Sequence, residues 1–87
     1  MNVKNVSEQL KILGHPIRLQ IVMGLLGNEC SVSKISEGLG IRQASASRHL
    51  ALLRNFDIIE GKRSGTQICY FVKDDKIARM VKSLMED

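Results

Sequence analysis

The chain contains few of the residues that build aromatic cores, disulfide frameworks and membrane spans. Its 87 residues include two phenylalanines, one tyrosine, no tryptophan, one proline and two cysteines. No apolar run approaches the roughly 20 residues that cross a bilayer, and residues 1–10 lack the apolar centre of a signal peptide. We therefore predict an aliphatic core, cysteines that are mostly free thiols, and a cytoplasmic location.

The length of the chain limits how stable one copy can be. A chain of 87 residues buries only about 60–65% of the surface that its unfolded form exposes. Small folds of this kind often gain stability by pairing with a second copy. We therefore expect a homodimer.

Positive charge is concentrated in one part of the sequence. Lysine and arginine number 13 against 9 acidic residues, which gives a formal charge of +4. Between positions 42 and 63 the basic residues are Arg42, Arg48, Arg54, Lys62 and Arg63, against only Asp57 and Glu60. A local excess of this kind favours an anionic partner such as nucleic acid.

Residues 42–55 predict a helix with an unusual polar face. Ala46, Leu50 and Leu53 recur at helical spacing and form a stripe that is typical of a core contact. The opposite face has no acidic residue; it consists of Gln43, Ala44, Ser47, Arg48 and Ala51. Short side chains with one Gln and one Arg suit a DNA groove, because both can form forked hydrogen bonds with base edges. The alternative is an ordinary solvent-exposed helix.

The remaining patterns predict a mainly helical fold with one β-hairpin. Helical periodicity indicates terminal helices over 5–13 and 75–86, a second helix from Pro16 to Leu26, and a short third helix that begins near Ser33. A short glycine turn joins the third helix to helix 42–55, as in a helix-turn-helix. Residues 58–72 read as two strands around the turn RSGT. We predict one winged helix-turn-helix domain spanning residues 1–87.

Three segments resemble the ArsR/SmtB family of repressors. They are LGHPIRLQIVMGLL (13–26), SVSKISEGLGIRQASASRHLALLRN (31–55) and GKRSGTQICYFV (61–72). The resemblance implies a homodimer, paired through the first and last helices, that represses transcription until a signal releases it from an operator. We expect an imperfect inverted repeat in double-stranded DNA as the operator, because a two-fold dimer presents two copies of one reading face. The alternative function is a winged-helix module that binds another protein without specific DNA binding.

The predicted contacts with DNA come from helix 42–55 and from the wing. They are Arg42, Gln43, Ala44, Ser45, Ser47, Arg48, His49, Lys62 and Arg63. Arg48 and its neighbours are the expected base readers, and Lys62 and Arg63 the expected wing contacts. For His49 the alternative is a ring that is hydrogen-bonded within the fold. Arg42 stands where the family usually has a Ser or Thr cap, so Gln43 or a phosphate is expected to satisfy the first amide groups.

The dimer interface is predicted from the apolar stripes of the two terminal helices. Its expected residues are Val6, Leu10, Leu13, Ile77, Val81 and Leu84. These stripes would remain in contact with water in an isolated chain. No nucleophile context or glycine-rich phosphate loop indicates an enzyme, and we predict no catalytic residues and no cofactor.

The sequence lacks the metal-binding residues of the family that it resembles. Where metal-sensing relatives have paired thiolates, this chain has Ser31 and Ser33, and Cys30 lies one place out of register. The last helix has no histidine and carries Lys76 where a ligand would be needed. This chain also has no cysteine on the second or the last helix, where sulfide-type sensors have theirs. We predict no metal site.

The two cysteines are the only candidates for redox chemistry. Alternation along extended segments places Cys30 on the side of Val32 and Cys69 between Ile68 and Tyr70, the expected inward pair. Residues on opposite faces cannot form a normal disulfide. We therefore predict two independent thiols; redox sensing and metal ligation remain as alternatives.

Overall fold

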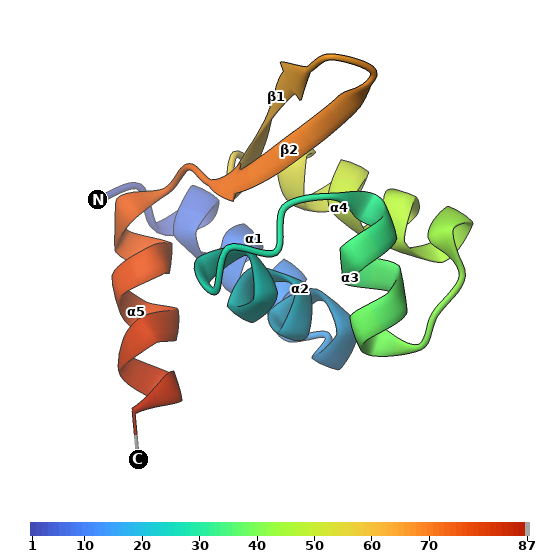
Figure 1. Ribbon diagram of the computed structural model, residues 1–87. Helices are drawn as coiled ribbons and strands as arrows, with labels where there is room; N and C mark the ends of the chain where they lie inside the picture. The colour runs from blue at the N-terminus through green and yellow to red at the C-terminus, as the bar shows by residue number, and fades with distance from the viewer. Residues whose placement is uncertain (87) are drawn as a thin grey trace.

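The computed structural model describes residues 1–86 and contains five helices and one antiparallel hairpin (Figure 1). The elements are α1 (Val3–Leu13), α2 (Pro16–Leu26), α3 (Val32–Leu39), α4 (Gln43–Asn55), β1 (Ile59–Ser64), β2 (Gln67–Val72) and α5 (Asp75–Met85). The predicted fold class, a winged helix-turn-helix, is confirmed. None of the helices in the described part is long and apolar enough to cross a membrane.

Side-chain caps fix where most of the helices begin. Asn2 accepts a hydrogen bond from the amide of Asn5, so α1 starts two residues earlier than the apolar pattern indicates. Ser31 accepts from the amide of Lys34, which places the start of α3 at Val32 rather than near Ser33. Gly40 ends α3 in the left-handed conformation, with φ of 66°, which glycine adopts without a steric penalty.

Helix α2 lies at the centre of the core, where it packs against the other four helices and β2. Its Ile21 and Val22 are almost completely buried, as are Leu50 and Leu53 of α4. In Figure 1, α4 and α5 lie on opposite sides of α2. Helix α4 is therefore held against the same helix that supports α5.

Three residues of the predicted dimer interface belong to the core of a single chain. Leu13, Ile77 and Val81 are only 5%, 4% and 0% exposed. The assignment of these three to the interface was wrong, because a stripe of apolar residues does not say whether it packs on its own chain or on a partner. Leu10 and Leu84 are 45% and 68% exposed, and Val6 is half-buried.

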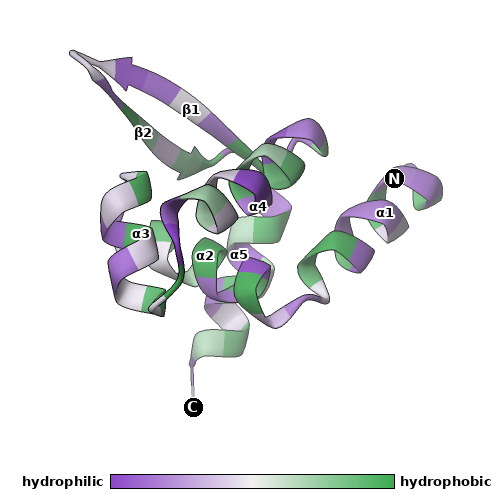
Figure 2. Ribbon diagram, turned by 90° about the vertical axis from the view of Figure 1, so that its right-hand side faces the viewer, coloured by the Kyte–Doolittle hydropathy of each residue, from purple (hydrophilic) through white to green (hydrophobic). Residues whose placement is uncertain are grey.

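The hairpin is anchored at its base and projects from the helices. Ile58 and Ile59 are buried, whereas no residue from 60 to 72 is buried. Gly61 lies opposite Tyr70, and a Cβ there would come within 2.7 Å of the Ile68 methyl group Cγ2. Glycine therefore lets the Ile68 and Tyr70 side chains pack closely on the opposite strand at this point. Figure 2 shows that β1 is mainly hydrophilic and β2 mainly hydrophobic.

Candidate nucleic-acid interface

The two sides of α4 differ in burial as the sequence predicts. Ala46, Leu50 and Leu53 are at most 1% exposed and face the core. The exposed residues of the first two turns are Gln43, Ala44, Ser47 and Arg48, and Ser45 is half-buried. Since α4 contains no acidic residue, this face can approach a polyanion without like-charge repulsion.

The N-terminus of α4 has no side-chain cap. Arg42 occupies the cap position without a capping hydrogen bond, whereas α1, α2, α3 and α5 are each capped by a side chain. The Gln43 side chain does not satisfy the free amides as we expected; its Nε2 donates to Ser33 Oγ at 3.1 Å. The first amide groups of α4, together with the positive end of the helix dipole, are therefore available to an anion such as a phosphate.

His49 points from α4 towards α2. Its Nδ1 lies 3.4 Å from Arg18 Nη1, and its ring centroid lies 4.9 Å from that of His15. Because arginine can only donate, Nδ1 must accept this bond. Burial lowers the pKa of His49 from the ordinary value of 6.5, and positive charge at His15, Arg18 and Arg48 lowers it further. In this structure His49 thus has the environment that we gave as the alternative to DNA contact, a ring hydrogen-bonded within the fold.

Arg18 connects three helices behind the recognition face. Its Nε donates to the carbonyl oxygen of Ile12, the penultimate residue of α1, at 2.7 Å. Its Nη1 reaches His49 of α4 from α2. Arg18 therefore acts as a support for α4.

The two basic residues of the wing lie on opposite faces of the hairpin. Lys62 and Arg63 are both exposed and are neighbours on β1, directly before the turn. Lys62 is paired with Cys69 and Arg63 with Ile68. Because side chains alternate along a strand, one ligand surface cannot contact both side chains face-on. The pair is suited to reaching around the two sides of a wing tip that inserts at a groove.

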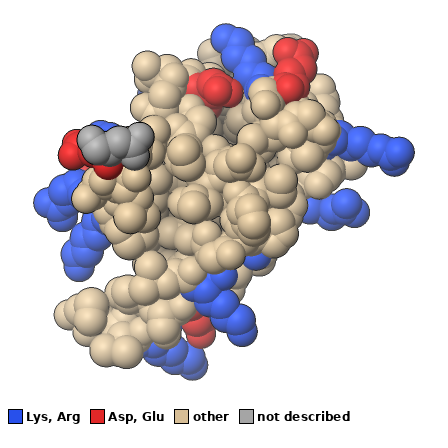
Figure 3. Space-filling view, turned by 90° about the horizontal axis from the view of Figure 1, so that it is seen from below, with Lys and Arg blue, Asp and Glu red and all other residues tan. Residues whose placement is uncertain are grey.

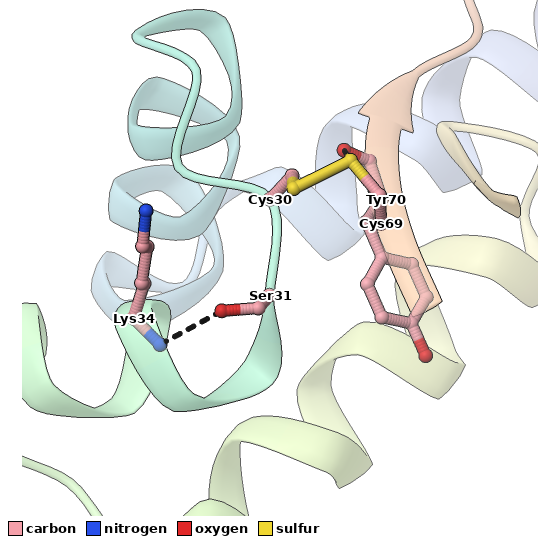
Figure 4. The surroundings of a disulfide bond; sticks show 5 residues. All are labelled: Cys30, Ser31, Lys34, Cys69 and Tyr70. Atoms are coloured by element: carbon pink, nitrogen blue, oxygen red, sulfur yellow. Dashed lines mark hydrogen bonds between the residues drawn. A yellow bond between two sulfur atoms is a disulfide. The ribbon is translucent and has the colours of Figure 1, made fainter. Parts of the chain in front are cut away.

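The structure contradicts the prediction of two independent thiols, because Cys30 and Cys69 form a disulfide with Cα atoms 4.7 Å apart (Figure 4). The alternation argument failed because the extended segment ends at Ser31, the cap of α3, so Cys30 and Val32 do not share a strand face. Ile68 was also misplaced, since it is 38% exposed rather than inward-facing. The segment before α3 also pairs with the wing, because the Tyr70 amide donates to the Cys30 carbonyl at 2.9 Å.

The serines at the family's thiolate positions have structural contacts. Ser31 caps α3, and Ser33 accepts a hydrogen bond from Gln43. Within residues 1–86, no three His, Cys, Asp or Glu side chains gather in a way that could hold a metal ion. The hydroxyl groups at these positions thus fix the helix-turn-helix.

Gln9 is a connecting residue that the sequence pattern did not identify. Its Nε2 donates to the carbonyl oxygen of Phe56 at 3.0 Å and to Asp74 Oδ2 at 3.2 Å. It thereby joins α1 to the residue that ends α4 and to the residue that caps α5. No local signal marks such a residue, because both partners are distant in sequence.

Comparison with known proteins identifies the family of this chain. Residues 15–61, which include all of α2, α3 and α4, match the sequence profile of "Bacterial regulatory protein, arsR family". The chain belongs to the arsR family. It is 38% identical over 79 residues to the biofilm growth-associated repressor of Xylella fastidiosa, covering 91% of this chain and 69% of that protein. The predicted class, a transcriptional regulator, is thereby confirmed, and the family is one of regulatory proteins rather than of enzymes.

Solved structures of this arsR-family fold agree with the arrangement described above. The repressor PagR of Bacillus anthracis matches with a TM-score of 0.87 and 30% identity, covering 97% of each chain. A homodimeric winged helix-turn-helix DNA-binding domain from Mycobacterium bovis, described as a possible ArsR-family regulator, matches with a TM-score of 0.85 and 28% identity. That match covers 95% of this chain and 77% of the other.

The charge distribution distinguishes the two ends of this arsR-family protein. Figure 3 views the molecule from the end opposite the wing, and the centre of that face is formed by uncharged residues, with Lys, Arg, Asp and Glu around its edge. The exposed cations of α4 and the wing, by contrast, flank the helix-turn-helix. A polyanion is therefore expected at α4 and the wing.

Proposed function

We propose that the protein is a homodimeric repressor that binds an imperfect inverted repeat in double-stranded DNA and leaves it in response to a signal. The observation that carries this proposal is the exposed, acid-free face of α4 in a chain of the arsR family. Such a repressor acts where bacterial DNA lies, in the cytoplasm.

The base-reading residues of the proposal lie in the first two turns of α4. Arg48 and Gln43 supply forked hydrogen bonds, and Ala44 and Ser47 are short enough to let the helix approach the base edges. Gln43 is held by Ser33 in the free protein. This contact fixes the position of its amide before DNA arrives, which reduces the entropy lost on binding.

The phosphate contacts of the proposal surround this reading face. Arg42 and the uncapped amides of α4 lie at its N-terminal end, and Ser45 lies beside them. Lys62 and Arg63 extend the contact to the wing. Such contacts set the orientation of the protein and give affinity for any sequence, whereas base contacts give specificity.

His49 plays a supporting part in the proposal, although it shares α4 with the reading residues. Its contact with Arg18 links the middle of α4 to α2. A ring held in this way steadies α4 against α2, and any approach of His49 to a phosphate is secondary to this role.

The proposed dimer interface uses the apolar residues that one chain leaves exposed. On α1 these are Val3 and Leu10, and on α5 they are Leu84 and Met85, all between 42% and 68% exposed. Val6 lies on α1 between them and is half-buried. Together these side chains form a surface that a second copy would remove from water.

Selection of fragments from the source genome tests the DNA site. We expect bound fragments to share an inverted repeat whose half-sites are about one helical turn, or a multiple of it, apart. Affinity should fall with salt at a log-log slope of about −0.9 for each phosphate neutralised. If no fragment is retarded at about 50 mM salt, the protein-binding module becomes the better explanation.

The dimer is tested by Leu84→Glu. A carboxylate in the proposed interface should give monomers in sedimentation experiments and should abolish operator binding, while the fold of each chain is retained. Ser83→Glu is the matched control, since it adds the same charge among the polar residues of α5. A monomeric Leu84→Glu variant that binds its operator with full affinity contradicts the proposed interface.

A further inference from the structure

The Cys30–Cys69 disulfide lies between the two proposed DNA-contacting parts of the molecule. Cys30 directly precedes Ser31, the cap of α3, and Cys69 is in the middle of β2. Figure 4 shows the bond crossing from the segment before α3 to the strand, with the Tyr70 ring pointing away from it. The bond therefore joins the helix-turn-helix to the wing at a point well above the base of the hairpin.

On the side of the helices, a short series of contacts leads from the disulfide to the reading face. Ser31 holds the first turn of α3 through the Lys34 amide, at 3.2 Å. Two residues further on, Ser33 accepts the hydrogen bond from Gln43, the first residue of α4. A displacement of Cys30 would thus be passed to the N-terminus of the recognition helix.

On the side of the wing, the disulfide holds β2 at a point beyond the residues that pack on the core. Cys69 is paired with Lys62, one of the two exposed cations of the wing. One backbone hydrogen bond, from Tyr70 to Cys30, connects β2 to the segment before α3 in the described part of the chain. An isolated two-stranded hairpin is marginally stable in water. Tyr70 and Val72 pack against the core, and the covalent bond adds a restraint at Cys69, nearer the turn of the hairpin.

We propose that Cys30 and Cys69 form a redox-controlled clamp, in which the disulfide fixes the wing relative to the helix-turn-helix and strengthens DNA binding, and reduction weakens it. The clamp rests on the proposed DNA-binding function and specifies how that function is regulated. Fixing both contact surfaces in advance lowers the conformational entropy lost on binding. Peroxide-class oxidants would form the disulfide of the clamp, and dithiol reductants would break it.

The disulfide of the clamp can form by oxidation and be broken again by reduction. One thiolate attacks a peroxide oxygen to give a sulfenic acid and release the other oxygen as water or alcohol. The second thiolate displaces the sulfenic hydroxyl as water, which forms the S–S bond. A dithiol reverses the process by exchange, becoming a disulfide while both cysteines become thiols. Both residues are half-buried rather than fully enclosed, so small reagents can reach them.

The test compares the affinity of the oxidised and reduced protein for one selected DNA fragment. We expect the oxidised form to bind about three- to tenfold more tightly, mainly through slower dissociation. Cys30→Ser/Cys69→Ser should bind like the reduced protein and should not respond to peroxide or dithiol. The single variants Cys30→Ser and Cys69→Ser should behave in the same way, because either one removes the bond.

Independent readouts separate failure of the clamp from failure of the proposed function. Since the chain has only two cysteines, alkylation followed by mass measurement reports directly whether the pair is bonded within one chain, and circular dichroism reports the fold. Equal affinity of the two forms, tighter binding after reduction, or a disulfide that joins two chains would overturn the clamp. An absence of DNA binding in both states would instead overturn the proposed function.

Discussion

The helical body and the wing are held together by different forces. The body is stabilised by buried aliphatic side chains such as Ile21, Val22, Leu50 and Leu53. The wing beyond Ile59 contains no buried residue and depends on strand pairing, on the contacts around Gly61, and on the disulfide. We therefore expect changes to buried residues of the body to act first on folding, and changes to the wing to act first on binding.

The largest expected effect is on the stability of the body. Leu53→Ala removes a side chain that is 0% exposed, and we expect a loss of about 2–5 kcal/mol in the free energy of unfolding from lost burial and a cavity. Urea denaturation measures this loss. Ile68→Ala in the wing should cost below about 1 kcal/mol, because Ile68 is 38% exposed. Similar losses in the two variants would remove the distinction between body and wing.

The next effect concerns specificity. Arg48→Ala should weaken operator binding by about 1–3 kcal/mol and relax the preference at one base pair in each half-site. Lys62→Ala in the wing should weaken binding to all sequences alike and reduce the salt slope by about 1. Titration of both variants against a panel of single-base operator changes measures the difference. Matching profiles across the panel would contradict the division into base reading by α4 and phosphate contact by the wing.

A smaller effect is expected from crowding within the hairpin. Gly61→Ala places a methyl group 2.7 Å from Ile68 Cγ2 and 3.1 Å from the Tyr70 ring. We expect this to separate the strands and to lower stability by about 1 kcal/mol, with weaker DNA binding. Gly61→Ala/Ile68→Ala should recover part of both, as thermal denaturation and DNA titration can show. If the second change brings no recovery, the close contact is not the cause.

The smallest effect is a dependence of stability on pH. The pKa of His49 is lowered in the folded protein, so the unfolded chain binds a proton more readily than the folded one. The contribution of His49 is therefore complete above its ordinary pKa of 6.5 and is lost as pH falls from there through the lowered value. Thermal unfolding at several pH values should show this loss. His49→Gln should reduce it, whereas Lys62→Ala in the wing should leave it unchanged.

The residues that sequence analysis placed correctly depend on local periodicity. The stripe of Ala46, Leu50 and Leu53 was predicted because three positions on one helix face have a single consistent explanation. Leu13 and Val81 were assigned to a dimer because periodicity identifies an apolar face but not the surface that covers it. The link between Gln9 and Asp74 was not predictable, because it arises only when the fold brings α1 next to the residue that caps α5.

The cysteine pair shows where alternation along a strand stops being informative. The rule was applied across Ser31, where the chain leaves the extended conformation and enters α3. Beyond that point the period changes from two residues to 3.6, so a side chain no longer reports the face of its neighbour. Prediction of the disulfide required the position of that boundary, which depends on the Ser31 cap.

The double contact of Gln9 has a mechanical consequence. One amide group holds the carbonyl of Phe56, at the end of α4, and the carboxylate of Asp74, at the start of α5. Helix α1 therefore cannot slide past either helix without breaking one of these two bonds. In the proposed dimer, a movement of α1 would therefore also act on the C-terminal end of α4, so the spacing of the two α4 helices would depend on how the two α1 helices pack.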